Sequence, residues 1–98
     1  MSSMIVLQHP VADFDAWKQA FDSDPIGRVR GGVTRHAIYR PADDPSAVVV
    51  NLEFGTRAEA EAFLPTLRAL WQRVGDRIGF EAAGVQARIV DEVERVDY

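Results

Sequence analysis

Two apolar segments joined by a short turn, residues 34–40 and 47–54, constrain the fold of this chain more than any other feature. In the second segment apolar side chains recur at every other position, which is the period of a β-strand covered on one face. Between the segments, residues 41–45 contain two prolines and two aspartates, which favour a turn. The sequence therefore predicts a β-hairpin at the middle of one sheet. Its second strand divides its side chains between two faces, with Val48, Val50, Leu52 and Phe54 on one and Val49, Asn51 and Glu53 on the other.

A strand and a helix are expected before the hairpin. Residues 4–9 form a short apolar run that ends at a proline, which lacks the N–H needed by a strand ladder. Asp13 then stands where a helix N-cap is expected, before aromatic residues at helical spacing that include Trp17 and Phe21. An Asp-Pro pair ends this helix and opens a short turn over residues 24–30. The aromatic side of the helix should face the sheet.

A longer helix is expected after the hairpin. Thr56 and Glu59 form a T-x-x-E capping box, which marks its first turn. Apolar residues then recur at three- and four-residue steps over residues 60–74, as on one face of a helix. Pro65 removes an interior backbone bond, so a kink or a break is expected there. Gly75 is suited to end the helix.

The remaining residues complete the sheet. Residues 76–84 are expected to form a loop, with Ile78 and Phe80 against the sheet edge, and residues 85–93 alternate as a last strand. The element order is then βαββαβ. This order predicts an α+β, ferredoxin-like fold in which both helices cover one face of a four-stranded antiparallel sheet.

The opposite face of such a sheet has no element left to cover it. That face carries Val49 beside Asn51, Glu53 and Arg88, a mixture of apolar and polar side chains. A chain of 98 residues also buries only about 60–65% of its unfolded surface when it folds alone. A second subunit is the simplest cover, so we expect a homodimer that uses this face.

Composition excludes several classes of function. The chain has 11 Lys and Arg against 15 Asp and Glu, a formal charge of −4, and no basic run, which argues against nucleic-acid binding. It has no cysteine, which excludes disulfides, thiolate metal sites and iron–sulfur clusters. No segment approaches 18 consecutive apolar residues, and no signal peptide is evident, so we expect a cytoplasmic protein without a membrane contact.

Cofactors are not expected either. The two histidines, His9 and His36, do not have the spacing of a metal site, and a metal would need carboxylates from distant segments. No glycine-rich phosphate loop follows a strand, and the Gly-Gly pair at 31–32 is a turn rather than a nucleotide motif. We predict that the protein carries no metal, flavin or haem.

Three segments resemble a known superfamily: residues 13–21 (DFDAWKQAF), 43–54 (DDPSAVVVNLEF) and 56–63 (TRAEAEAF). They are similar to the dimeric α/β-barrel superfamily, in particular to small antibiotic-biosynthesis-monooxygenase-like proteins, and the resemblance covers nearly the whole chain. It implies two ferredoxin-like sheets packed face to face into a barrel. Members of the superfamily include cofactor-independent oxygenases, haem-degrading enzymes, polyketide cyclases and ligand-sensing domains, so the fold alone does not give the function.

Among the activities of this superfamily, haem degradation is the one that the sequence argues against. The haem-degrading members of the superfamily share an Asn on the first strand, a Trp and a later His. Here the first strand offers Leu7 and Gln8, Trp71 could match the Trp, and no histidine follows His36.

Two residues are candidates for catalysis. His36 could act as a general base or as a haem ligand, and an imidazole with a pKa of about 6.5 suits proton transfer near neutrality. The alternative is a strand histidine half exposed on the sheet. Asn51 is a polar amide in an otherwise apolar strand and could orient a ligand carbonyl, or it could make a hydrogen bond across a subunit interface.

Four further residues are candidates for ligand binding: Tyr39, Glu53, Trp71 and Arg88. Arg88 could hold an anionic ligand, although a salt bridge with Glu53 across the sheet is the preferred interpretation. Tyr39 could donate a phenolic proton or simply pack on the strand. Trp71 could form a pocket wall or belong to the core.

Two functions are therefore compatible with the sequence. The first is a homodimeric enzyme that acts on a small organic molecule, either a cofactor-independent oxygenase or an isomerase, with His36 as base, Asn51 as carbonyl or oxyanion donor, and Tyr39 and Trp71 as walls. The second is a non-catalytic dimer or ligand-binding accessory module in which the same residues serve the interface. A cavity that encloses His36 or Asn51 would favour the enzyme.

Overall fold

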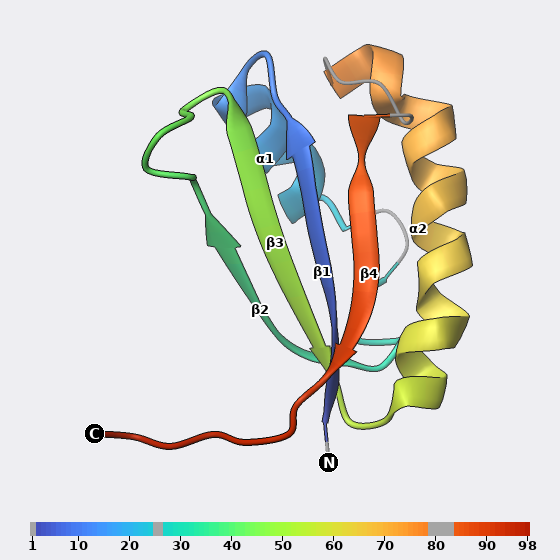
Figure 1. Ribbon diagram of the computed structural model, residues 1–98. Coiled ribbons are helices and arrows are strands. Elements are labelled where there is room, and N and C mark those ends of the chain that lie inside the picture. Colours follow the sequence, from blue (N-terminus) through green and yellow to red (C-terminus); the bar gives the residue numbers. More distant parts are fainter. Residues whose placement is uncertain (1, 25–26, 79–83) are drawn as a thin grey trace.

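The computed structural model describes residues 2–24, 27–78 and 84–98, and for residues 74–78 it describes the backbone alone (Figure 1). Within these residues the elements follow the predicted βαββαβ order. They are β1 (Ser3–Pro10), α1 (Phe14–Asp22), β2 (Val33–Tyr39), β3 (Ala47–Phe54), α2 (Arg57–Ile78) and β4 (Gln86–Asp91).

The four strands form one antiparallel sheet in the order β2-β3-β1-β4, and both helices cover the same face of it (Figure 1). The two hairpin strands β2 and β3 lie at one side, while β1 separates β3 from β4. This arrangement is the ferredoxin-like α+β fold, so the prediction made from the sequence is confirmed.

The core lies between the sheet and the helices, and β3 contributes most to it. Its helix-side residues Val48, Val50, Leu52 and Phe54 are at most 1% exposed, as the period of two predicts. Two of them are matched by apolar residues of β1, since Leu52 stands opposite Ile5 and Val50 opposite Leu7. The other two face polar residues of the same strand, His9 opposite Val48 and Ser3 opposite Phe54. Burial of such apolar surface is the main source of the fold's stability, because each Å² removed from water contributes about 25 cal/mol.

Helix α1 begins and packs as predicted. The side chain of Asp13 accepts a hydrogen bond from the Ala16 N–H at 3.2 Å, which is the expected N-cap. Trp17 is 4% exposed and lies against the ring of Phe21, with the ring centroids 5.3 Å apart. Phe21 is only partly buried, so the two aromatic residues do not contribute equally. Beyond the helix, Asp24 caps the next turn by accepting the Arg28 N–H at 2.9 Å.

Helix α2 also begins at its predicted capping box. The Glu59 N–H donates to Thr56 Oγ1 at 3.2 Å, and the Thr56 hydroxyl donates to the Glu59 carboxylate at 3.0 Å. The helix continues without a break past Pro65, which lies on its exposed side. Phe63 and Leu67, on either side of the proline, are both buried and hold the two turns on the sheet.

Two predicted boundaries near the C-terminus are wrong. Gly75 does not end α2, which runs to Ile78, so residues 76–78 are helical rather than a loop; one glycine costs only about 1 kcal/mol in a helix. Phe80 lies outside the described residues. The last strand ends at Asp91 rather than at Val93, whose side chain is 86% exposed. The ladder stops there because β1, the neighbour of β4, begins at Ser3, which stands opposite Asp91.

His9 is buried on the helix side of β1. Its side chain is 2% exposed, its Nδ1 lies 3.0 Å from the Pro10 carbonyl oxygen, and its ring centroid lies 5.8 Å from that of Trp17. Burial lowers the pKa of His9 below its ordinary value, because the charged imidazolium loses its hydration.

We predict that Trp17→Ala destabilises the protein by about 3–5 kcal/mol, because the indole fills the space between α1 and the sheet. Phe21→Ala should cost less, since its ring is only partly buried. Urea unfolding followed by circular dichroism measures both. Gln19→Ala, at an exposed position of the same helix, is the control and should unfold with the parent. An unchanged midpoint for Trp17→Ala would contradict this packing.

We further predict that stability falls on acidification and that His9 causes part of the loss. Because its pKa is lower in the folded state, protons bind the unfolded chain first, so stability is full above about pH 6.5 and decreases as the pH falls below that value. Unfolding free energies between pH 5 and pH 8 should show a smaller slope in His9→Gln. Gln19→Ala, at an exposed position of α1, is the control and should keep the parent slope. Equal slopes in the parent and His9→Gln would refute the assignment.

Candidate functional site

The sheet face opposite the helices, called here the open face, collects most of the candidate residues. Alternate residues of each strand point to it, and neighbouring strands place them in rows. In the central row, Asn51 stands between Ala37 of β2 and Val6 of β1, and Val6 stands beside Arg88 of β4. The face consists of Arg35, Ala37, Tyr39, Val49, Asn51, Glu53, Met4, Val6, Gln8, Gln86, Arg88 and Val90.

Asn51 occupies the middle of the open face. Its side-chain oxygen Oδ1 is buried and has no hydrogen-bond partner within the described part of the protein. Its row neighbours, Ala37 and Val6, are apolar and offer no side-chain donor. A buried acceptor left unpaired costs about 1–3 kcal/mol. A donor for this oxygen would have to come from outside the described residues.

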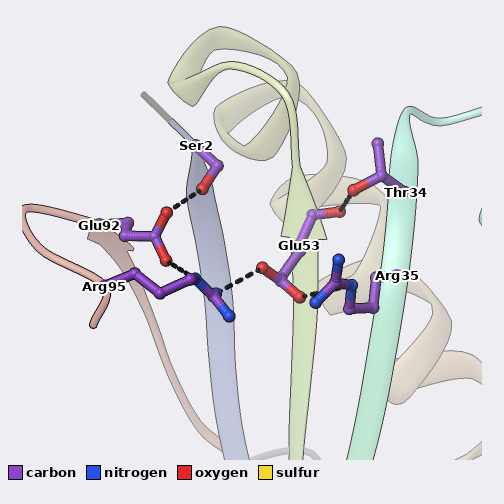
Figure 2. Close-up of polar contacts among 6 residues, drawn as sticks. All are labelled: Ser2, Thr34, Arg35, Glu53, Glu92 and Arg95. Carbon is purple, nitrogen blue, oxygen red and sulfur yellow. Dashed lines mark hydrogen bonds and ion pairs between the residues drawn. The ribbon is translucent and has the colours of Figure 1, made fainter. Parts of the chain in front are cut away.

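Glu53 anchors an ionic network at one end of the open face (Figure 2). Its Oε2 lies 3.3 Å from Arg35 Nε of β2, and its Oε1 lies 3.3 Å from Arg95 Nη2 of the C-terminal segment. Arg95 also binds Glu92 at 2.5 Å, and the Ser2 hydroxyl donates to Glu92 at 3.1 Å. The bond from Arg95, and then that from Ser2, lowers the pKa of Glu92. The network ties Glu92 and Arg95 of the C-terminal segment to the sheet.

The predicted salt bridge between Glu53 and Arg88 is wrong. Strand β1 lies between β3 and β4, so two strand spacings, about 10 Å in all, separate the two backbones. Arg35 and Arg95 take the two oxygens of Glu53 instead. Arg88 itself is exposed and forms no ion pair with any acid that the structure describes.

A shallow hollow of about 280 Å³ lies beside Arg88, along the junction of β1 and β4. Val6 gives it an apolar floor, and the amides of Gln8 and Gln86, which stand opposite each other in the ladder, border it with Arg88. The hollow is lined by Val6, Leu7, Gln8, Gln86, Ala87 and Arg88.

The two candidates for catalysis lie on opposite faces of the sheet. His36 stands opposite Leu52, so its side chain is on the helix side, where its ring lies edge-on to Phe21 at 5.1 Å between centroids. Asn51 is on the open face. One protomer therefore does not bring the His36 imidazole and the Asn51 amide into the same site.

The other candidates divide in the same way. Trp71 is 7% exposed and belongs to the core under α2. Tyr39 is on the open face beside Val49, where its side chain is 52% exposed at the rim. Asn51, Glu53, Arg88 and Tyr39 thus share one surface, as strand alternation predicts for the first two.

Sequence reasoning missed several polar side chains of the open face. Gln8 and Gln86 border the hollow, and Arg35 and Arg95 are the true partners of Glu53. Strand alternation in β1 could have placed Gln8 on this face, since Ile5 and Leu7 alternate with it. Arg95 had no such signal, because it follows the last strand.

No three His, Cys, Asp or Glu side chains gather as a metal site among the described residues. Over the same residues, no helix is both long enough and apolar enough to cross a membrane. The predicted lack of a bound metal or haem stays a prediction.

Solved structures share the fold of this chain, whereas no family model and no curated protein matches it. A protein from Nitrosomonas europaea, described as a candidate antibiotic biosynthesis monooxygenase, is 24% identical with a TM-score of 0.68 over 94% of this chain and 90% of that one. SnoaB, a cofactor-independent oxygenase from Streptomyces nogalater, is 13% identical with a TM-score of 0.74 over 99% and 98%. A dimeric ferredoxin-like protein from an uncultured marine organism is 14% identical with a TM-score of 0.65 over 97% and 98%.

The structural similarity establishes the fold, and the low sequence identities leave the reaction open. The resemblance predicted from the sequence is confirmed at that level. The chain has, over nearly its whole length, the ferredoxin-like fold of antibiotic-biosynthesis-monooxygenase-like proteins.

Proposed function

We propose that this protein is a homodimer in which two open faces meet, and that the dimer acts on a small organic molecule as a monooxygenase-like enzyme. The observation that carries the proposal is the buried, unpaired Oδ1 of Asn51 at the centre of a face that no helix covers. A protomer alone leaves this acceptor unsatisfied. A second copy with a ligand between the sheets gives it a donor.

The composition of the open face supports the dimer. Met4, Val6, Val49 and Val90 give it an apolar area, and the polar network of Glu53 lies at one end. An isologous pair would bury about 1,200–2,000 Å² in total, the usual size of a stable complex. One of the structures with this fold is described as dimeric.

The chemistry of Asn51 suits a substrate with a hydroxyl group. A buried amide oxygen accepts a hydrogen bond, and a phenol or enol donates one. An oxygenase that works without a cofactor takes from its substrate the electrons that reduce dioxygen, and an ionisable hydroxyl makes a carbon framework electron-rich. In a balanced reaction of this kind, a CH₂ group of the substrate and one molecule of O₂ give a C=O group and one molecule of H₂O. SnoaB, which has this fold, is described as a cofactor-independent oxygenase.

A non-catalytic ligand-binding dimer is the second candidate. The observation that favours it is the separation of His36 from Asn51 by the sheet, which leaves the Asn51 amide without that base in the same protomer. In this case the amide would orient a ligand, or bond across the interface, without any reaction.

We expect the purified protein to consume dioxygen with one or more members of a panel of small hydroxylated aromatic compounds, and to place one atom of ¹⁸O₂ in the product. Asn51→Leu should lower the rate at least about tenfold, the effect of losing one hydrogen bond worth about 1.4 kcal/mol, while the dimer persists. The matched control is Gln72→Leu, an amide replaced on the exposed side of α2, which should keep the parent rate. Binding without dioxygen consumption across the panel would favour the non-catalytic candidate.

We predict that Val49→Lys dissociates the dimer, because an unpaired ammonium in the apolar contact costs several kcal/mol unless it reaches water. Size-exclusion chromatography with light scattering at micromolar concentration measures the mass. Val29→Lys makes the same change at an exposed turn position and should leave the parent mass unchanged. A parent that runs at the 10.9 kDa of one chain would refute the dimer. A dimeric Val49→Lys would show that the copies use another surface.

A further inference from the structure

Arg88 is the charged side chain of the open face whose role the proposed function leaves unexplained. It lies on β4 at one border of the 280 Å³ hollow, with Gln86 two residues before it on the same face and Gln8 opposite Gln86 on β1. Three long polar side chains thus surround an apolar floor made by Val6.

No described acid neutralises Arg88. On the open face, Glu53 is the acid nearest to the centre, and its two oxygens are occupied by Arg35 and Arg95, each at 3.3 Å. Glu92, beyond the end of β4, binds Arg95 and Ser2. Glu53 and Glu92 are therefore both engaged, and the exposed guanidinium of Arg88 depends on water.

A symmetric second copy does not remedy this. In an isologous interface each copy presents the same patch, so the partner brings its own uncompensated arginine and its own occupied glutamate. Covering the open face also removes water from around Arg88, and a buried guanidinium is unfavourable without an anion. Neither sheet then supplies the negative charge, so its source is a bound anion or the partner's C-terminal tail, and the experiment below distinguishes the two.

We propose that the hollow binds the carboxylate of a small organic acid, an assignment that rests on the proposed function and narrows its substrate class. The planar fork of Arg88 holds a carboxylate through two parallel N–H bonds, and the amides of Gln8 and Gln86 donate to its remaining lone pairs. A volume of about 280 Å³ lies near the lower limit of ligand pockets, which begins at about 300 Å³, so the ligand is small.

The position of Asn51 connects this site with the proposed reaction. Asn51 and Arg88 flank Val6 in one row, so their backbones are about 10 Å apart, two strand spacings. The long side chain of Arg88 shortens the gap. One substituted ring with a carboxylate at one end and a hydroxyl at the other engages both residues. The substrate class is a hydroxylated small organic acid.

Calorimetry with 4-hydroxybenzoate and its uncharged amide, 4-hydroxybenzamide, at one fixed ionic strength tests the site. We expect the acid to bind the parent at least about tenfold more tightly than the amide, and Arg88→Gln to remove that difference, since a hydrogen bond to a charged group contributes at least a factor of this size. Arg68→Gln, an exposed arginine of α2, is the matched control and should keep the parent preference.

Two results would overturn the site. In the first, 4-hydroxybenzoate fails to bind the parent or binds Arg88→Gln equally well. In the second, Arg88→Gln and Glu94→Gln each weaken the dimer while the acid has no effect, which would make the partner's tail the counter-charge. Light scattering on the same samples separates the proposals. A dimeric parent that ignores the acid refutes the anion site alone, and a monomeric parent that binds it through Arg88 refutes the dimer alone.

Discussion

The packing of β3 against the helices is the constraint on which the rest of the structure depends. Val48, Val50, Leu52 and Phe54 are almost fully removed from solvent, and no other strand buries so many side chains so completely. A shift of the ladder by one residue would turn these four toward the open face and bring Asn51 and Glu53 into the core. The strong preference for one register therefore fixes the position of every polar group on the other side of the sheet.

The two faces of the sheet perform different tasks as a result. The helix side is filled by apolar and aromatic side chains, and burial there lowers the pKa of His9 and so favours its uncharged form. The open side holds a hollow, a guanidinium that no described acid neutralises, and an amide oxygen that no described group pairs. The proposed ligand chemistry is thus separated from the core by the thickness of a single β-sheet, and alternation along each strand decides on which face a residue lies.

Local signals in the sequence were sufficient for the elements but not for every contact between them. Period-two alternation predicted β3 and its two faces, and the Thr56–Glu59 capping box predicted the first turn of α2. The predicted pair of Glu53 and Arg88 failed because it depends on strand order, which no local pattern contains. The prediction that α2 ends at Gly75 failed because the preference of glycine against a helix is weak, and the helix continues to Ile78. Arg95 could not be placed at all, since its position depends on tertiary contacts with Glu53 and Glu92.

The place of β1 in the sheet has a consequence for the way the chain is made on the ribosome. Of the four described strands β1 is synthesised before the others, yet one of its two neighbours, β4, follows all of them, so Ser3 cannot pair with Asp91 until β4 is made. Until β4 emerges, the nascent chain can pair β1 with β3 but leaves the other edge of β1 unprotected. Such long-range pairing is slow and exposes an edge to other nascent chains. The need for chaperones during synthesis should therefore depend on the time between the synthesis of β3 and the emergence of β4 from the ribosome.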